Sequence, residues 1–279
     1  MLAGLLMVTL SAASWGTWSL FLRPSGLPPT VTSPIVFLVM ALVMLPAALR
    51  APRVTWDRRT VALVLANTAF DALNVITFFG ALSTTTVAIA TLTHYAAPIL
   101  VALAAPKIDG TRVPGTLPAA ATALAGLVIV LEPWAAPVDG AALGAALGFA
   151  SAICYAGNVF VVRRLAHRLG PPRAMSYHSL LAALVLAPFA LVDLPAAPSP
   201  SGLLLVVAGA VTIGAVSGVV FAYGLVRVGS ARAAVLTFAE PLVAVAVGAV
   251  VWEEPLHLTS ALGAVLVLGA GIHVASKAR

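Results

Sequence analysis

Two long apolar runs lie next to each other near the end of the chain, at residues 233–252 and 256–275. Each has about the 20 residues that an α-helix needs to cross the hydrocarbon core of a bilayer. Only Glu253, Glu254 and Pro255 connect them. The pair is therefore predicted to form a tight transmembrane hairpin.

An internal repeat relates this hairpin to an earlier part of the chain. When Pro98 is aligned with Pro241, the segment ATLTHYAAPILVAL matches AAVLTFAEPLVAVA without a gap, at a constant offset of 143 residues. The same offset aligns Ala81 with Gly224. The chain is therefore predicted to contain two copies of one unit.

The composition excludes a water-soluble domain. Hydrophobic residues make up 61% of the chain and charged residues 9%, and the mean hydropathy is +1.08, whereas about 25% of the residues in a soluble domain are charged. We therefore expect a polytopic membrane protein. The net charge of +6 comes from basic residues between the apolar runs, where membrane topology explains them, so nucleic-acid binding is not expected. The single cysteine, Cys154, excludes an intramolecular disulfide.

Hydropathy, interrupted by proline, glycine and charge, predicts ten transmembrane helices and leaves no stretch for a soluble domain. The predicted spans are residues 2–22, 33–50, 60–81, 87–106, 114–131, 141–162, 174–193, 202–226, 233–252 and 256–275. The first lacks the basic start of a secretory signal, so it is predicted to be a retained helix. The longest gap, residues 163–173, is predicted to be a short basic loop.

The distribution of Lys and Arg predicts that both termini are cytoplasmic. With ten spans, one side of the membrane holds fourteen basic residues and the other holds Arg23 alone, which is the bias of the positive-inside rule. The fourteen residues are Arg50, Arg53, Arg58, Arg59, Lys107, Arg112, Arg163, Arg164, Arg168, Arg173, Arg227, Arg232, Lys277 and Arg279.

Five spans in each copy place the two copies in opposite directions across the membrane. Residues 1–131 form the first predicted repeat and residues 139–279 the second, and an offset of 140 aligns Trp15 of the first span with Tyr155 of the sixth. The expected fold is thus all-α, with ten transmembrane helices in two inverted five-helix repeats. In transporters, inverted repeats place the substrate site near the midplane, at the interface between the repeats.

The residues that carry this repeat resemble the EamA-type transporters of the drug/metabolite transporter superfamily. They are Trp15-Gly16, the AL pair and small-residue turn within residues 81–90, Pro98, and above all LTFAEPLVAVAVGAVVWEEPL at residues 236–256. The second copy has the Glu-Pro pair typical of the family at Glu240-Pro241. The first copy departs from the pattern, with Ala97 before Pro98, so no role is expected that needs two symmetric carboxylates.

The resemblance implies a carrier of small organic metabolites or drugs, often an exporter in the bacterial inner (plasma) membrane, without a bound cofactor or ATP hydrolysis. It does not identify the substrate. More distant relatives in the superfamily carry sugar phosphates or nucleotide sugars, and this alternative stays open.

Asp71 is the first candidate site residue because it lies midway through the third predicted span. Asn74 and Phe78 follow at i+3 and i+7 and share its helix face. A carboxyl group at this depth must face a cavity or a partner. It either binds a substrate amine or a proton, or it joins helices through hydrogen bonds.

His94 is the second candidate, near the middle of the fourth predicted span. Its similar depth permits a pair with Asp71, and this pair would act as a proton relay. The alternative is a single hydrogen bond between two helices.

Glu240 lies within the ninth predicted span beside Pro241, and Pro98 is the corresponding proline of the first repeat. A proline lacks the amide donor that the carbonyl one turn earlier would use. We therefore expect gating or structural roles for Glu240, Pro241 and Pro98, with substrate contact as the alternative for Glu240.

Three further residues are candidates for the lining of the substrate or proton pathway. Trp15 and Tyr155 lie deep in their predicted spans, and Asn158 lies about one turn from the inner end of its own. Trp and Tyr nearer to span ends are expected at the membrane interface. His178 and His273 are placed near the inner edge and are given no role.

Motifs for metal, phosphate or dinucleotide chemistry are absent from the sequence, so an enzyme is not expected, and neither is a cofactor or metal. The predicted function is a secondary transporter that works by alternating access, with a small-molecule substrate, the lipid bilayer and protons as partners. An uncoupled facilitative permease and a structural membrane protein are the alternatives. One chain holds both repeats, so a monomer or a homodimer is compatible with a pathway.

Overall fold

The computed structural model describes residues 1–52, 54–110, 113–134, 140–193, 198–254 and 258–277. Within these ranges the chain is helical and no strand occurs. The earlier helices are α1 (Leu2–Trp15), α2 (Ser19–Ser25), α3 (Pro29–Arg50), α4 (Arg58–Thr84), α5 (Val87–His94), α6 (Ala97–Ile108) and α7 (Thr116–Leu131). The later elements are α8 (Ala141–Leu169), α9 (Pro171–Asp193), α10 (Pro200–Gly209), the π-helical segment η1 (Ala210–Val216), α11 (Ser217–Val228), α12 (Ser230–Leu236), α13 (Ala239–Val251) and α14 (Leu258–Ser276).

Nine continuous helical stretches of the described chain are long and apolar enough to cross a membrane. Four of them join consecutive elements: α1 with α2, α5 with α6, α10 with η1 and α11, and α12 with α13. The remaining expected span, the fifth in sequence (residues 114–131), corresponds to α7, which has 16 residues and is about 24 Å long. The expected multi-pass helical membrane fold is confirmed, whereas α7 is shorter than the hydrocarbon core of about 30 Å.

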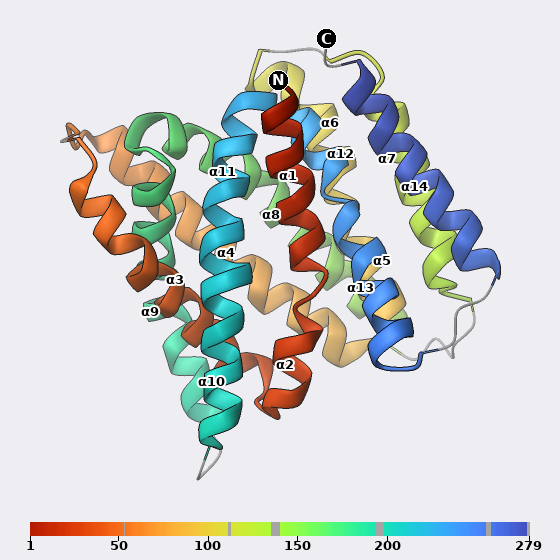
Figure 1. Cartoon of the computed structure of the whole chain (residues 1–279), viewed down its shortest axis with the longest axis horizontal. Helices are drawn as coiled ribbons and strands as arrows, with labels where there is room; N and C mark the ends of the chain where they lie inside the picture. Colours follow the sequence, from red (N-terminus) through yellow and green to blue (C-terminus); the bar gives the residue numbers. More distant parts are fainter. Residues whose placement is uncertain (53, 111–112, 135–139, 194–197, 255–257, 278–279) are drawn as a thin grey trace.

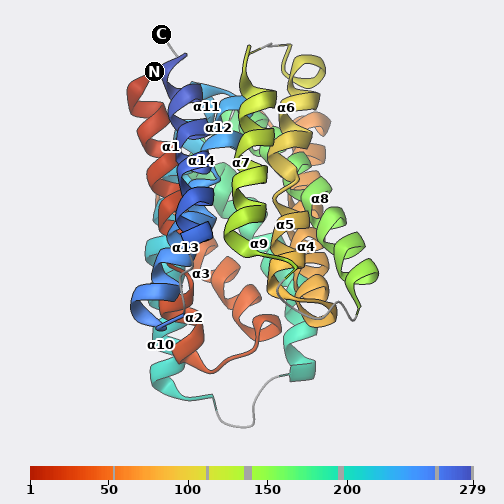
Figure 2. The same cartoon turned by 90° about the vertical axis from the view of Figure 1, so that its right-hand side faces the viewer.

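Helix pairs far apart in sequence pack side by side. In the described chain α3 packs against α9, α4 against α8, α1 against α11, and α7 against α14. Figures 1 and 2 show α7 and α14 as a pair at one side of the bundle. The start of α1 and the end of α14 lie at the same end of the bundle (Figures 1 and 2).

Two helix breaks occur just before prolines. One separates α5 from α6 at Tyr95, and the other separates α12 from α13 at Thr237. Pro98 and Pro241 follow these breaks within the first turn of the next helix, and both are buried. Because proline has no amide proton, the helical hydrogen-bond ladder is interrupted at these turns.

The structure corrects the predicted loop at residues 163–173. α8 continues to Leu169, and α9 begins at Pro171 after Gly170, whose φ is +78°. Three arginines of the expected loop, Arg163, Arg164 and Arg168, are therefore on the last turns of α8. Arg163 lies 3.1 Å from Asp109, and Arg168 lies 3.1 Å from Asp57. Arg53, Arg112, Arg279 and the hairpin residue Pro255 lie outside the described residues.

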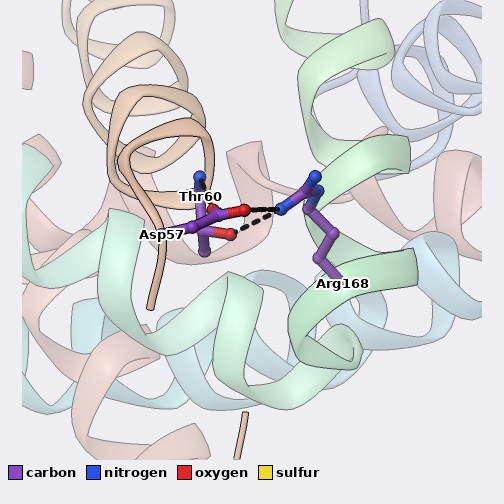
Figure 3. Close-up of polar contacts among 3 residues, drawn as sticks. All are labelled: Asp57, Thr60 and Arg168. Carbon is purple, nitrogen blue, oxygen red and sulfur yellow. Dashed lines mark hydrogen bonds and ion pairs between the residues drawn. The ribbon is translucent and has the colours of Figure 1, made fainter. Parts of the chain in front are cut away.

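Asp57 joins α4 to α8 at the end of the bundle that carries the termini. Its carboxylate caps α4 by accepting a hydrogen bond from the Thr60 amide at 2.7 Å. Nη1 of Arg168 lies 3.1 Å from each carboxylate oxygen and donates to the Thr60 hydroxyl at 2.8 Å (Figure 3). The same side chains therefore cap one helix and hold a second helix against it.

Candidate functional site

A cavity of about 320 Å³ lies between elements from the first and second halves of the chain, bounded by α1, α3, α4, α5, α8, α9, η1, α11 and α13. Its lining includes these sequence-predicted residues: Trp15, Asp71, Asn74, His94, Tyr155, Asn158 and Glu240. Residues predicted on five different spans are thus brought to one place. Pro98 and Pro241 are not among its lining residues.

Asp71 lies at the midpoint of α4, with its side chain 16% exposed. Its carboxylate accepts hydrogen bonds from the side-chain amides of Asn158, on α8, and Asn67, one turn earlier on α4, where the distance is 3.3 Å. Nδ1 of His178, on α9, lies 3.3 Å from Oδ2 of Asp71. Both carboxylate oxygens of Asp71 therefore have donors or a basic neighbour from three helices.

His178 lines the cavity but was not predicted as a site residue from the sequence. It was placed near the inner edge without a role, but its side chain is only 3% exposed and lines the cavity beside Asp71. The error follows from the predicted start of this span at residue 174, since α9 begins at Pro171 and carries His178 two turns into the helix. Asn67 was also missed, although its i−4 spacing from Asp71 is readable from the sequence.

His94 contacts Ser151 rather than Asp71. Its Nδ1 lies 2.7 Å from the Ser151 hydroxyl, which donates to the Asn74 side-chain oxygen, also at 2.7 Å. Because the single hydroxyl proton of Ser151 is used toward Asn74, Nδ1 of His94 must carry the proton of the neutral ring. No hydrogen bond or ion pair joins Asp71 and His94 among the interactions of the described residues.

Aromatic rings pack around His94 and across the cavity. The His94 ring lies 4.8 Å from Phe78 and 5.3 Å from Tyr155, centroid to centroid. Trp15, which also lines the cavity, packs against Phe221 with ring centroids 4.8 Å apart. The cavity therefore combines polar groups at chosen points with broad aromatic faces, as small-molecule sites commonly do.

Glu240 is the second residue of α13, directly after the α12–α13 break. Its side chain lines the cavity, and its carboxylate takes part in none of the side-chain hydrogen bonds found among the described residues. The α1–α2 break at Gly16 packs against the same turn, where a Cβ on Gly16 would lie 2.8 Å from the Ala244 nitrogen and would collide with the Glu240 carbonyl. The glycine thus lets α1 approach α13 and brings Trp15 to the wall that carries Glu240.

The part of the chain that the structure describes holds no group of three or more His, Cys, Asp or Glu side chains placed to bind a metal ion. Among the described residues that line the cavity, none is Lys or Arg. The electrostatic character of the site is set by two carboxyl groups, two histidines and neutral amides.

The fold and this cavity define a polytopic helical membrane protein whose bundle holds a largely apolar cavity with a few polar and ionisable groups. The model of the EamA-like transporter family matches residues 142–275. An uncharacterized transporter of Archaeoglobus fulgidus is 32% identical over 270 residues, which cover 96% of this chain and 94% of that protein. The chain belongs to the EamA-like transporter family.

A solved structure has the same fold. The chain superimposes on a crystal structure with a TM-score of 0.85 and 22% sequence identity, and the match covers 98% of both chains. At this identity the likeness concerns the fold alone. It shows that the arrangement of helices around the cavity has a counterpart in an experimental structure.

Proposed function

We propose that the protein is a secondary transporter that moves a small organic metabolite or drug across the bacterial inner membrane by alternating access. The observation that carries this proposal is the cavity, whose walls come from both halves of the chain and hold Asp71, His94, His178 and Glu240. Ionisable groups at this depth are costly unless a cavity or a partner needs them. Export, as the direction, is carried over from the family resemblance.

Ten spans in two inverted repeats, at residues 1–131 and 139–279, are part of this proposal. The packing supports it, because helices at equivalent positions in the two copies pair with each other, α3 with α9 and α7 with α14. The third span of each copy also packs against the first span of the other copy, α4 against α8 and α11 against α1. Such a pattern is expected when two copies are related by a two-fold axis in the membrane plane.

Cytoplasmic termini are also proposed. α3, α6, α8 and α11 end, and α4, α7, α9 and α12 begin, at the end of the bundle where both termini lie (Figure 1). The basic residues at those helix ends therefore share one face. The positive-inside rule favours the cytoplasm for that face.

Proton coupling is proposed at Asp71, with His178 as its basic neighbour in place of His94. The groups that face Asp71 are Asn67 on its own helix, Asn158 on α8 and His178 on α9. A carboxyl group with a histidine 3.3 Å away has two stable ways to hold one proton. Binding of a substrate in the same cavity would favour one of them.

The first test is a thermal-shift screen of the purified protein against amines, amino acids, nucleosides and sugar phosphates. A ligand of the folded state raises the melting temperature with its concentration. A stabilising solute is then loaded into liposomes that contain the protein, and its flux is measured with and without an imposed pH gradient. Saturable flux supports a carrier, and its absence for every stabilising solute contradicts one.

Asp71→Asn separates the coupled transporter from the uncoupled permease. If the proposal is right, the variant folds but loses flux driven by the pH gradient, whereas the exposed carboxylate variant Asp193→Asn keeps it. Flux that is unchanged by Asp71→Asn and indifferent to the gradient identifies a facilitative permease.

A further inference from the structure

The two carboxyl groups of the cavity differ in how their hydrogen-bonding capacity is used. Asp71 is surrounded by Asn67, Asn158 and His178. Glu240 also lines the cavity, but its carboxylate takes part in none of the side-chain hydrogen bonds or ion pairs found among the described residues. A carboxylate has about four lone-pair sites, so Glu240 keeps acceptor capacity for a group that enters the cavity.

Aromatic side chains surround the wall that holds Glu240. Tyr155 lines the same cavity, and the approach of Gly16 to α13 brings Trp15 close to the turn that carries Glu240. Phe221 packs on Trp15 and also lines the cavity. Aromatic faces attract cations, most strongly where water is excluded. A carboxylate among aromatic rings is a suitable site for an organic cation.

An anionic ligand would find no permanently charged basic side chain among the described lining residues, and the two histidines already contact Asp71 and Ser151. None of the described lining residues is Lys or Arg, and an unpaired buried anion is strongly disfavoured. The phosphate of a sugar phosphate or nucleotide sugar would lie in a chamber that already holds two carboxyl groups. The carboxylate of an amino acid would have the same difficulty at one end.

We propose that the substrate is a small organic cation, an amine or quaternary ammonium compound with an apolar or single-ring body, and that Glu240 binds its charge. This inference rests on the proposed transport function and assigns Glu240 a binding role beyond the gating role expected from sequence. The cavity of about 320 Å³ is at the small end of ligand pockets, which fits a single-ring compound.

Three probes with the same ring and similar chain test the charge preference: phenethylamine, phenylalanine and 3-phenylpropionate, a cation, a zwitterion and an anion at neutral pH. Their affinities are measured by calorimetry on the purified full-length protein. We expect phenethylamine to bind most tightly and 3-phenylpropionate not to bind. Tighter binding of the anion or the zwitterion overturns the inference, as does the absence of phenethylamine binding. This ranking needs no variant.

Glu240→Gln tests the assigned residue, with Glu254→Gln as a control. Glu254 is an exposed carboxylate paired with Arg23 at 2.7 Å, away from the cavity lining. We expect Glu240→Gln to weaken phenethylamine binding at least tenfold and Glu254→Gln to leave it unchanged. Wild-type affinity in Glu240→Gln overturns the assignment. If that variant does not fold, Glu240→Asp is used, with the same expectation of at least tenfold weaker binding.

Flux measurements distinguish failure of this inference from failure of the transport proposal. Saturable flux of phenylalanine or 3-phenylpropionate without flux of phenethylamine leaves the carrier intact and overturns the cation preference. Loss of saturable flux for every solute that stabilises the protein contradicts the carrier itself.

Discussion

The rings of Tyr95 and Phe238 pack against each other, with centroids 5.6 Å apart and planes inclined by 34°. The two residues are 143 positions apart in sequence, the offset that relates Pro98 to Pro241. Equivalent positions of the two proposed repeats therefore touch each other, which places this pair on the axis between them. Each residue also lies in a helix break, Tyr95 between α5 and α6 and Phe238 between α12 and α13.

Truncation of this aromatic pair is expected to destabilise the fold. Phe238 is 1% exposed, so Phe238→Ala should lower the free energy of unfolding by about 3–5 kcal/mol. Phe238→Leu keeps most of the volume and should cost about 1.5 kcal/mol or less. Thermal unfolding in detergent measures both variants. Equal melting temperatures for the two would show that the ring packing contributes little.

A side chain at Gly16 is expected to force α1 away from α13. Gly16→Val places atoms against the Glu240 carbonyl and the Ala244 nitrogen, and overpacking of this kind costs about 1–3 kcal/mol. Ligand binding in the cavity should weaken as well, because Trp15 moves with α1. Gly269→Ala is the control, since a Cβ there meets no atom within 4 Å. A Gly16→Val variant as stable as wild type would contradict the close approach.

Arg173 is expected to hold the C-terminal end of α3 in place. The buried guanidinium donates to the carbonyl oxygens of Ala48, Ala51 and Pro52 at 2.8–3.2 Å. Lysine keeps the charge but cannot reproduce the planar fork, so Arg173→Lys should lower the free energy of unfolding by about 3 kcal/mol. The exposed Arg50 provides a matched Arg→Lys control on the same face, for which no measurable loss is expected.

The link between Asp57 and Arg168 predicts a loss of stability in acid. The Thr60 hydroxyl, then the Thr60 amide and Arg168, hold the pKa of the Asp57 carboxyl well below its usual range. A group whose folded-state pKa is lowered stabilises the fold above its unfolded pKa, about 3.9 for Asp. That contribution is lost as the pH falls through the folded value. The melting temperature should therefore decrease as the pH is lowered below about 4.

Asp57→Asn checks the origin of this acid dependence. The variant should be less stable than wild type at neutral pH and should approach it in acid, because the uncharged amide cannot gain from ionisation. Parallel pH profiles of the two proteins would assign the acid dependence to other carboxyl groups.

The part of the site that depends on spacing along a single helix could be predicted from the sequence. Asp71 and Asn74 share a helix face by spacing alone, and the structure places both in the cavity. The contact between His94 and Ser151 joins α5 to α8, so it depends on tertiary packing that no spacing encodes. His178 was missed because a shift of three residues in the start of α9 changes its depth.

Fold prediction failed where a local signal was absent. The π-helical turn η1 lies in an ordinary run of small and apolar residues, and nothing in AVTIGAV distinguishes it from an α-helix. The sixth span was predicted to end just before the basic residues. Instead, α8 continues to Leu169 because arginines on its last turns pair with Asp57 and Asp109 at the end of the bundle. Charge ended the apolar run without ending the helix.

The offset of 143 also places Gly214, in η1, opposite Asp71, and Ala97 opposite Glu240. Each carboxyl group of the cavity thus has a small residue at the equivalent position of the other half. A symmetric homodimer of five-helix chains would carry each carboxyl group twice, so a ligand could bind equally well in two opposite orientations. In this chain the two walls of the cavity carry different groups, so a substrate with two chemically different ends would bind in a single orientation.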